Sequence, residues 1–561
     1  MSTRNTVPAA SAVQTPVLPE AQSGRRASTL LAVVLLSVFL PVANIFIVNV
    51  AAPSIQLALH ASFAEVQFLI AGYTVAYAAA LIIGGRLGDR YGRKRMLLVG
   101  VAGFTLAALL CGLSTGVGML LPLRVIQGVF AAMMAPQVLS LIQANYAPER
   151  RAAVFGLYGA AQGVAATSGQ LIGGLLLHWN PLDLDWRTVF FFSVPVGLLI
   201  LCLLPSIGES KSADRSKLDI AGAILAAAGI VMLIYPLVQG QKEGWPAGLI
   251  ACLALSVPVL AGFVWYERRL ARIGRVPFMN VGLFRQRSFS FGMLVVFVLL
   301  CSQSAYFLVS AYFLQIGLGF TALKAGLVIL PMGAGYFAAS LYSARAAAKF
   351  GPHVLTAGAV LTSLGYALLA AAVHRTGTDF AGYEWIPVLA VLGLGQGAIA
   401  APLTNVILAK VRAADIGSAS GILTTGMQAA FAIGIALTGL LLLSLMSGNA
   451  DAVSQRLAPQ LVERLGALQT SEAQKAELAA KFRSCYGEYA HSSDPSVLPD
   501  SCKTVLTNDA FGMVMAAHLK LANAANYAYA FEICLYVLAL FTAALIPLVL
   551  GVIGRRRAGG I

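Results

Sequence analysis

The segment GRLGDRYGRKR, which begins at Gly85, combines glycines, one acid and several bases. Gly85 and Gly92 permit close helix approach and tight turning. Asp89 could sit at a helix end and pair with a neighbouring arginine, Arg90 or Arg93. Membrane anchoring by positive charge would explain the bases, but neither the acid nor the glycine spacing. We therefore interpret this segment as a latch that holds one state of the molecule.

Arg124, in the segment LPLRVIQG, lies deeper in an apolar stretch than an interfacial arginine prefers. Ionisable side chains inside a membrane are functional candidates by default. Glu65 and Glu532 lie near the ends of apolar stretches and are further candidates for carrying protons. The alternative is that all three are ordinary interfacial residues.

Long apolar stretches must position these side chains. Of 561 residues, 58% are hydrophobic and 11% are charged, which indicates a membrane protein. A bilayer core about 30 Å thick needs ~20 apolar residues per helix. Hydrocarbon offers no water to bond the backbone N–H and C=O groups, and a helix satisfies them internally. We predict an all-α integral membrane protein with fourteen spans: 30–51, 66–84, 96–114, 119–146, 152–177, 189–204, 220–238, 247–266, 289–316, 323–342, 354–373, 385–408, 417–446 and 527–553.

The basic residues predict the orientation. Most lysines and arginines in short loops fall on one side when both termini are placed in the cytoplasm, whereas the opposite short loops hold only Arg187, Lys242, Lys324 and Arg375. The net charge of +15 therefore reflects topology, and we expect no nucleic-acid partner. The expected location is the cell inner membrane, with the bilayer as surroundings.

The spans divide as six, two and six, because hydrophilic segments bracket one pair of helices. The two larger sets carry faint internal symmetry, the plan of carriers that rock about a midplane site. The predicted parts are a cytoplasmic tail (1–27), an N-terminal six-helix bundle (28–206), a two-helix insertion with flanking cytoplasmic loops (207–287), a C-terminal six-helix bundle (288–553) and a second tail (554–561). The insertion at 447–526 is expected outside, either as a folded cap or as a partly disordered loop.

The fifth span is rich in glycine, which gives a smooth face for close helix packing and sliding. Polar and aromatic residues within the spans are candidates for a central cavity, although each could equally bridge two helices. These candidates are Asn44, Asn49, Tyr73, Gln127, Gln137, Gln162, Gln170, Gln303, Tyr306, Gln396, Asn405 and Gln428. Tyr312 belongs to the same set.

Two cysteines, Cys485 and Cys502, lie outside the spans in the insertion at 447–526. Oxidising compartments favour disulfides, so a bridge between them is predicted, with two free thiols as the alternative. The other five cysteines fall inside spans, where a small thiol packs well.

Several motifs occur in a fixed order: GRLGDRYGRKR, LPLRVIQG, the glycine-rich fifth span, DWRTVFFFSVPVG and GSASGILTTGMQ. Together they resemble the fourteen-span drug:proton antiporter family of the major facilitator superfamily. This resemblance implies the major facilitator fold, a cytoplasmic gate at Gly85, Asp89, Arg90, Gly92 and Arg93, and a part for Arg124 in proton coupling.

Two positions depart from the pattern of that family. NIFIVNVAAP has Asn44 where the family usually has Asp, and SGQLIGG has Gln170 where the family usually has Pro. Asn cannot titrate, so a proton carrier expected in the first half is missing. Few deep carboxylates also favour neutral, zwitterionic or anionic substrates over strongly cationic ones.

The leading hypothesis is a proton-coupled exporter of small organic molecules, with no enzymatic activity, metal or cofactor. A facilitator or importer of one metabolite is the second hypothesis, and a membrane sensor is a remote third. Nucleotide-loop and zinc-helix motifs do not occur in the sequence, which argues against ATP-driven pumping and zinc-dependent hydrolysis. The sequence does not reveal a periplasmic adaptor, the substrate or the oligomeric state.

Overall fold

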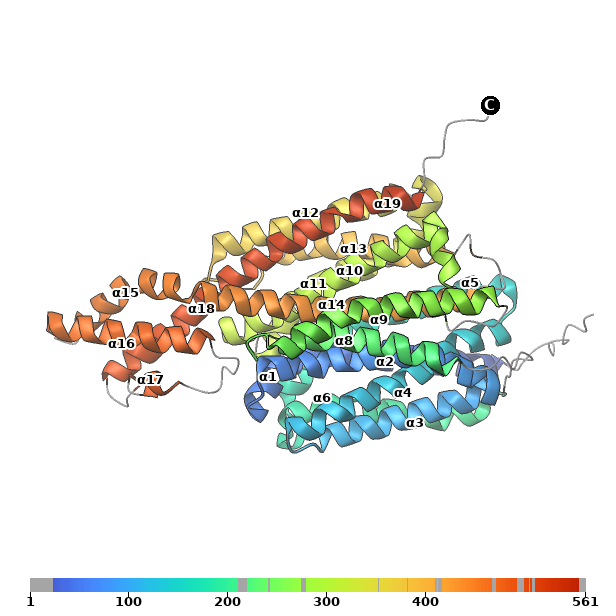
Figure 1. Ribbon diagram of the computed structural model, residues 1–561, viewed down its shortest axis with the longest axis horizontal. Helices are drawn as coiled ribbons and strands as arrows, with labels where there is room; N and C mark the ends of the chain where they lie inside the picture. The colour runs from blue at the N-terminus through green and yellow to red at the C-terminus, as the bar shows by residue number, and fades with distance from the viewer. Residues whose placement is uncertain are drawn as a thin grey trace, which may run out of the picture.

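The protein was analysed as a computed structural model, which describes residues 24–209, 219–240, 243–273, 279–351, 353–380, 382–408, 411, 416–466, 471–491, 499–503, 505–506 and 510–553. These residues form a bundle of long helices with a smaller helical projection at one end (Figure 1). Throughout the described ranges the regular elements are all helical, as expected for an all-α protein.

The N-terminal group of helices comprises α1 to α7. Their bounds are α1 Gly24–Leu59, α2 Phe63–Tyr91, α3 Arg93–Gly112, α4 Val117–Asn145, α5 Pro148–Trp179, α6 Thr188–Phe191 and α7 Ser193–Leu203, with the 3₁₀ turns η1 Pro181–Asp183, η2 Asp185–Arg187 and η3 Leu204–Ser206. Residues 24–27 therefore begin a helix and do not belong to the predicted flexible tail; residues 1–23 of that tail lie outside the described ranges.

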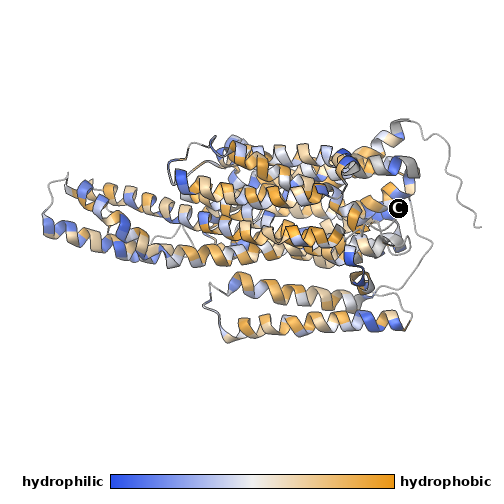
Figure 2. Ribbon diagram, turned by 90° about the horizontal axis from the view of Figure 1, so that it is seen from above, coloured by the Kyte–Doolittle hydropathy of each residue, from blue (hydrophilic) through white to orange (hydrophobic). Residues whose placement is uncertain are grey.

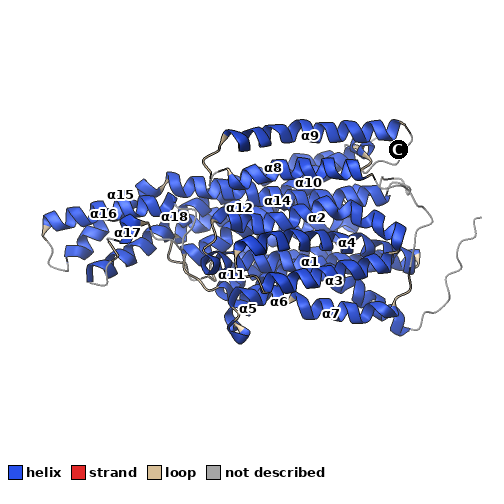
Figure 3. Cartoon of the chain, turned by 60° about the horizontal axis from the view of Figure 1, so that its bottom comes forward, coloured by secondary structure: helices blue, strands red, loops and turns tan. Residues whose placement is uncertain are grey.

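Two helices, α8 (Ile220–Gln239) and α9 (Ala247–Arg272), follow as an antiparallel pair. Helix α8 packs on α2 and α14, whereas α9 packs on α8 and on the turn η4 (Val281–Arg285). Figure 3 shows α9 at the outer edge of the molecule.

The C-terminal group surrounds α10. Its bounds are α10 Arg287–Tyr312, the π-helical turn η5 Phe313–Gly317, α11 Ala322–Phe350, α12 His353–Thr376, α13 Ile386–Leu408, α14 Ile416–Gly448, α18 Ala510–Ala543 and α19 Leu545–Ile553. Helices α18 and α19 are separate because Pro547, one turn after Ala543, has no N–H to continue the backbone bonding.

The same packing order recurs in the two groups. Helix α2 packs on α4 as α11 packs on α13, α3 on α4 as α12 on α13, and α1 on α5 as α10 on α14. Between the groups, α5 packs on α11 and α14 packs on α2, again in a reciprocal way. The junctions also correspond: Gly92 (φ +111°) joins α2 to α3, and Gly351 (φ +63°) joins α11 to α12. Positive φ at both junctions explains the choice of glycine.

Thirteen helices in the described ranges are long and apolar enough to cross a membrane. Each of the fourteen predicted spans falls on a helix, but α5, the predicted fifth span, is not among these thirteen. The chain is thus a multi-pass membrane protein, and the arrangement of fourteen spans as six, two and six stays a prediction.

The insertion between α14 and α18 forms a helical cap, which we define as α15 (Ala450–Gly466), α16 (Glu472–His491) and α17 (Asp500–Lys503) together with the first turns of α18. Buried Leu461, Phe482, Tyr486 and Met515 belong to its own hydrophobic core. The apolar stretch through α18 and α19 covers 43 residues, or about 65 Å of helix, about twice what a bilayer core requires. Its first part therefore belongs to the cap and not to a span.

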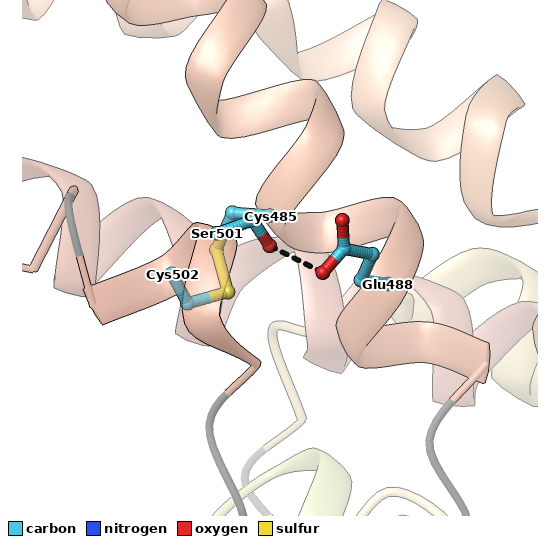
Figure 4. The surroundings of a disulfide bond; sticks show 4 residues. All are labelled: Cys485, Glu488, Ser501 and Cys502. Carbon is cyan, nitrogen blue, oxygen red and sulfur yellow. Dashed lines mark hydrogen bonds between the residues drawn. A yellow bond between two sulfur atoms is a disulfide. The ribbon is translucent and has the colours of Figure 1, made fainter.

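A disulfide joins Cys485 of α16 to Cys502 of α17, the pair predicted from the sequence (Figure 4). Beside it, the hydroxyl of Ser501 donates a hydrogen bond to Glu488 at 2.7 Å. The bridge closes the short connection between the two helices, so the insertion is a folded unit and not a loose loop. We call the end of the bundle that carries this cap the cap end, and the opposite end, where α2 meets α3, the basic end.

Hydrophobic residues predominate along the helices of the bundle, while hydrophilic residues gather at its two ends and in the cap (Figure 2). The main core lies where the two groups meet. There the Phe46 ring of α1 contacts Phe307 of α10 and Phe431 of α14, with centroids 5.0 and 5.9 Å apart. Edge-to-face contacts of this kind add to the burial of the rings.

Candidate functional site

A buried arginine with polar neighbours forms the centre of the N-terminal group. The Arg124 side chain, in α4, is fully buried. Its Nη1 donates hydrogen bonds of 2.6 Å to the side-chain oxygens of Asn44 and Gln127, and its Nε donates to the backbone carbonyl of Leu69 at 3.2 Å. Asn44 in turn donates to the Ser193 hydroxyl at 3.2 Å. These contacts connect α1, α2, α4 and α7.

Aromatic rings enclose the same guanidinium group. The Tyr73 ring lies under it at 4.4 Å and the Phe190 ring at 5.8 Å. Ring faces attract cations, and more strongly where water is excluded. The neighbours are amides, carbonyls and rings, so the Arg124 charge is held by dipoles and ring faces, where a carboxylate would be the usual partner. The Asn44 position explains this arrangement, because Asp there would have supplied the counter-charge.

Two buried polar atoms at this site, Nη2 of Arg124 and Nε2 of Gln127, have no hydrogen-bond partner among the described residues. The same holds for both amide atoms of Asn49, elsewhere on α1. Buried groups of this kind are rare and costly. They indicate a site whose hydrogen bonding is completed in another state or by a bound species.

Helix α5 passes between α1 and α11, and its glycines allow both contacts. At Gly173 an added Cβ would lie 2.4 Å from the Val50 side chain, and at Gly174 it would lie 2.7 Å from the Ala322 carbonyl oxygen. Farther from the cap end the contact loosens: at Gly163 the nearest atom belongs to Tyr336 at 3.4 Å, and at Gly159 no atom lies within 4 Å. Helix α5 is therefore packed tightly at Gly173 and Gly174 and has open space beside Gly159.

Three hydrogen bonds between the two groups lie toward the cap end, and a fourth, from the Thr425 hydroxyl to the Ala78 carbonyl at 3.5 Å, lies nearer the basic end. The Tyr312 hydroxyl donates to Gln56 at 2.6 Å, and Gln315, in the π-helical turn, donates to the Val50 carbonyl at 2.9 Å. π-Helical turns often mark functional positions. A third bond crosses from α2 to α14: Gln67 donates to the Ile435 carbonyl at 3.0 Å.

The Gln67 side chain occupies the space above Gly439. A Cβ at Gly439 would lie only 1.3 Å from Nε2 of Gln67, so any larger residue would displace the glutamine. Together with the bonds of Tyr312 and Gln315, this contact seals the cap end. We call the three bonds the cap-end seal.

A small pocket lies between the two groups, below the cap-end seal. Its lining includes Gln170 and Gln303, both predicted cavity residues, together with Phe307 and Tyr336. Its volume of about 20 Å³ holds one water molecule, whereas a drug-sized ligand requires roughly 300 Å³ or more. The groups must separate before such a molecule can bind.

Predicted cavity residues also form hydrogen bonds within one group. Gln303 donates to Gln396, which donates to Tyr366, in a chain through the C-terminal group. Gln137 of α4 donates to the Gly84 carbonyl of α2, whereas Gln162 donates to the Tyr158 hydroxyl within α5. The remaining positions are Tyr306, which is buried, and Gln428, which is partly buried; the Asn405 side chain lies outside the described ones.

The two predicted proton-carrying acids both have partners. Glu65 forms a capping box with Ser62 at the start of α2, which stabilises the first helical turn. Glu532, on α18, lies 3.0 Å from His374 of α12. Neither geometry assigns these acids a part in proton coupling, and that part stays a prediction.

The predicted latch segment spans the junction of α2 and α3. Glu209 accepts hydrogen bonds from the backbone N–H groups of Lys94 and Arg95 at 3.0 and 3.3 Å, and Lys94 donates to the Ile207 carbonyl at 2.6 Å. A carboxylate at a helix N-terminus is favoured by the free N–H groups and the dipole. The Asp89 side chain lies outside the described ones, so its predicted pairing with Arg90 or Arg93 is untested.

A match to a family model decides the identity of the fold. The model of the Major Facilitator Superfamily matches residues 34–435. The chain belongs to the Major Facilitator Superfamily. Among solved structures, the chain is similar in fold to a bacterial homologue of the human lysosomal transporter Spinster, in an inward-facing and unoccupied conformation, with a TM-score of 0.58, 17% identity and coverage of 95% of this chain and 98% of that one. A D-xylose–proton symporter matches with a TM-score of 0.52, 15% identity and coverage of 74% and 90%.

Proteins of closer sequence carry names that describe antibiotic transport or drug resistance. The "Probable actinorhodin transporter" of Streptomyces coelicolor is 36% identical over 82% of this chain and 80% of its own length. The puromycin resistance protein of Streptomyces alboniger is 34% identical over 72% and 80%, and the multidrug resistance protein Stp of Mycobacterium tuberculosis is 30% identical over 76% and 78%. This chain is accordingly a transporter of small molecules and not an enzyme.

Sequence reasoning missed several residues of this Major Facilitator site. Gln56 and Gln67 form two bonds of the cap-end seal, Glu209 holds the α3 terminus, and Ser193 completes the Arg124 network. Gln56 and Gln67 carried a detectable signal, because each is an amide placed among apolar residues near a span end. Ser193 and Glu209 carried none, since small hydroxyls and loop acids are common.

Proposed function

We propose that this chain is a proton-coupled exporter of drugs or other small organic molecules, working by alternating access. The observation that carries the proposal is a difference between the two ends of the interface that joins the groups. Toward the cap end three hydrogen bonds, involving Gln56, Gln67 and Gln315, hold the groups together, whereas nearer the basic end one longer bond of 3.5 Å joins them and Gly159 of α5 has open space beside it. A carrier in this state receives its substrate from the basic end. Separation of the cap-end seal then releases it on the other side.

The proposal includes the orientation. The basic end lies in the cytoplasm of a cell with both termini on that side, and the membrane is the inner membrane. Residues 28–206 and 288–553 act as two six-helix halves, and residues 207–287 are an insertion. Helix α5, the fifth along the chain, crosses the membrane as well, which raises the thirteen candidate spans to fourteen. The reciprocal packing of α5 on α11 and α14 on α2 supports two halves that rock against each other.

Relatives support the direction of transport, since their names describe antibiotic transport and resistance. Within this chain, Arg124 is proposed to couple protons to substrate, with Glu65 and Glu532 as further candidates. Asp89 and Arg90, with the glycines of the same segment, are proposed to gate the cytoplasmic side.

A second candidate function rests on one contact. Asn44 accepts a hydrogen bond from Arg124 where an acid would give a protonatable pair. A carrier without proton antiport, such as a facilitator or importer of one metabolite, is consistent with that contact.

Everted membrane vesicles distinguish the two candidates. A pre-formed pH gradient is followed by a fluorescent weak base while actinorhodin, puromycin and a wider compound panel are added. A proton-coupled exporter dissipates the gradient when its substrate is added, and the Arg124→Ala and Asp89→Asn carriers do not, although they insert normally. Substrate flux that is indifferent to the gradient would establish the second candidate.

A further inference from the structure

Helix α9 is unusually exposed for an apolar helix. Only 17% of its most apolar window is buried, the lowest share among the thirteen candidate spans. One side of α9 meets α8, and Figure 3 shows it at the outer edge of the molecule. The other side therefore faces the bilayer.

The exposed face of α9 changes from apolar to cationic along its length. Val257, Ala261, Trp265 and Arg269 follow one another at four-residue spacing, which places them on one side of the helix, and all four are exposed. Arg268 and Arg272 lie beside this row and are exposed as well. The hydrophilic tip of this outermost helix is visible in Figure 2.

The nearby acids do not neutralise these arginines. The Glu267 carboxylate is fully buried and accepts a hydrogen bond from the Met279 N–H at 2.8 Å. Asp219 accepts hydrogen bonds from the Gly222 N–H and the Tyr266 hydroxyl. In the described parts of the chain, no ion pair joins Arg268, Arg269 or Arg272 to a carboxylate.

Trp265 marks the boundary between the apolar and the cationic parts of this face. The Arg269 guanidinium lies 5.5 Å from its ring centre, so ring and cation share one surface. Tryptophan is enriched where hydrocarbon meets the headgroup region. The face thus offers hydrocarbon contact, then an interfacial ring, then three cations, in the order found along a lipid molecule.

We propose that this face of α9 binds the headgroup phosphate of one anionic phospholipid through Arg268, Arg269 and Arg272, with an acyl chain along Val257 and Ala261. Arginine suits phosphate because its planar donors match the oxygen geometry. A free phosphate would use only the arginines and leave the apolar part empty. The proposal requires that α9 spans the bilayer, but it does not depend on the substrate or on proton coupling.

Native mass spectrometry of the full-length protein tests the site. The detergent-purified protein is titrated with phosphatidylglycerol, with phosphatidylcholine and with inorganic phosphate. Because each arginine near a membrane surface contributes about fivefold to anionic lipid binding, the triple variant R268Q/R269Q/R272Q should bind the first phosphatidylglycerol about a hundredfold more weakly. The single variant R272Q should show about a fivefold loss, and it keeps the test available if the triple variant does not insert.

The matched control is R285Q/R287Q/R345Q, which removes the same charge from the same end of the bundle. It should keep the first phosphatidylglycerol site, while wild type binds phosphatidylcholine weakly and millimolar phosphate does not displace the lipid. Equal losses in the two triple variants would mean that diffuse charge attracts the lipid, and would overturn the proposal. Equal binding of phosphatidylcholine, or displacement by phosphate alone, would overturn it as well.

Discussion

Asn44 and Arg124 lie on different helices and share a hydrogen bond of 2.6 Å from the guanidinium Nη1 to the amide oxygen. Both side chains are fully buried. Their arrangement resembles that of an ion pair, but Arg124 is charged and Asn44 is neutral. In a low-dielectric interior an unbalanced charge interacts strongly with anything that approaches it. This relationship makes Asn44 and Arg124 the most informative positions to change.

Asn44→Asp should introduce a protonatable group where the wild type has none. We expect the transport rate of this variant to depend more steeply on pH than that of the wild type, measured in proteoliposomes between pH 5.5 and 8.5. Asn44→Leu serves as the control, because it removes the amide without adding an acid. Superimposable pH profiles for Asn44→Asp and wild type would contradict the interpretation of this site.

Arg124→Lys should lower transport by about tenfold or more, although the charge is kept. The guanidinium satisfies Asn44, Gln127 and the Leu69 carbonyl at once, and an ammonium group cannot reproduce that planar arrangement. Each acceptor left unpaired costs about 1–3 kcal/mol. Initial uptake rates in vesicles, normalised to the amount of folded carrier, measure the loss; a rate near that of wild type would show that charge alone suffices.

Gly439→Ala should open the cap-end seal. The new methyl group would displace Gln67, whose bond to the Ile435 carbonyl would be lost. We expect the carrier to shift toward the state open at the cap end, seen as faster labelling of a cysteine placed at Gln56, and transport to slow. Gly448→Ala, on the same helix but with no atom within 4 Å, is the matched control.

Combining Gly439→Ala with Gln67→Ala should restore part of the wild-type labelling rate, because the space occupied by the glutamine becomes free. If the double variant labels as fast as Gly439→Ala alone, the steric account of Gly439 is wrong.

His518 should make the stability of the cap depend on pH. The ring is buried in α18 and meets Phe482 edge-on, with ring centroids 6.1 Å apart. Burial, and then the positive charge of Arg464, lower the pKa of His518 below its ordinary 6.5. Because the unfolded histidine binds a proton more readily than the folded one, the cap loses stability as the pH falls below about 6.5.

Hydrogen exchange of α16, corrected for intrinsic rates, should therefore be faster at pH 5.5 than at pH 7.5. His518→Phe should remove most of this difference, whereas His491→Gln, at an exposed position of α16, should leave it unchanged. An equal pH effect in both variants would assign the titration to another group.

The spans were predictable because hydrocarbon imposes a length and a composition on every crossing. The latch segment was predictable in position, since Gly92 is the turn between α2 and α3, but its partner Glu209 comes from a distant loop. For the cap, the sequence alone does not distinguish a folded unit from a disordered loop. Helix α16 has few apolar residues, and its core depends on the Cys485–Cys502 bridge and on α18.

Contacts between the two groups could not be derived from one sequence. Gln170 and Gln303 do meet at a common pocket, whereas Asn44 and Gln127 serve the Arg124 network inside one group. All four are polar residues in apolar helices, so residue type alone does not distinguish the two locations. The rotation and tilt of each helix determine whether a polar side chain reaches the pocket or the Arg124 network, and both are set by packing against neighbouring helices.

A reversible lock across the cap-end seal tests alternating access most directly. Cysteines are placed at Gln67 and Gly439 in a carrier whose five free cysteines have been replaced, and transport is measured after oxidation and again after mild reduction. The account predicts that oxidation stops transport and that reduction restores it, while the carrier without the added pair is unaffected by either treatment. Undiminished transport by the fully cross-linked carrier would contradict it.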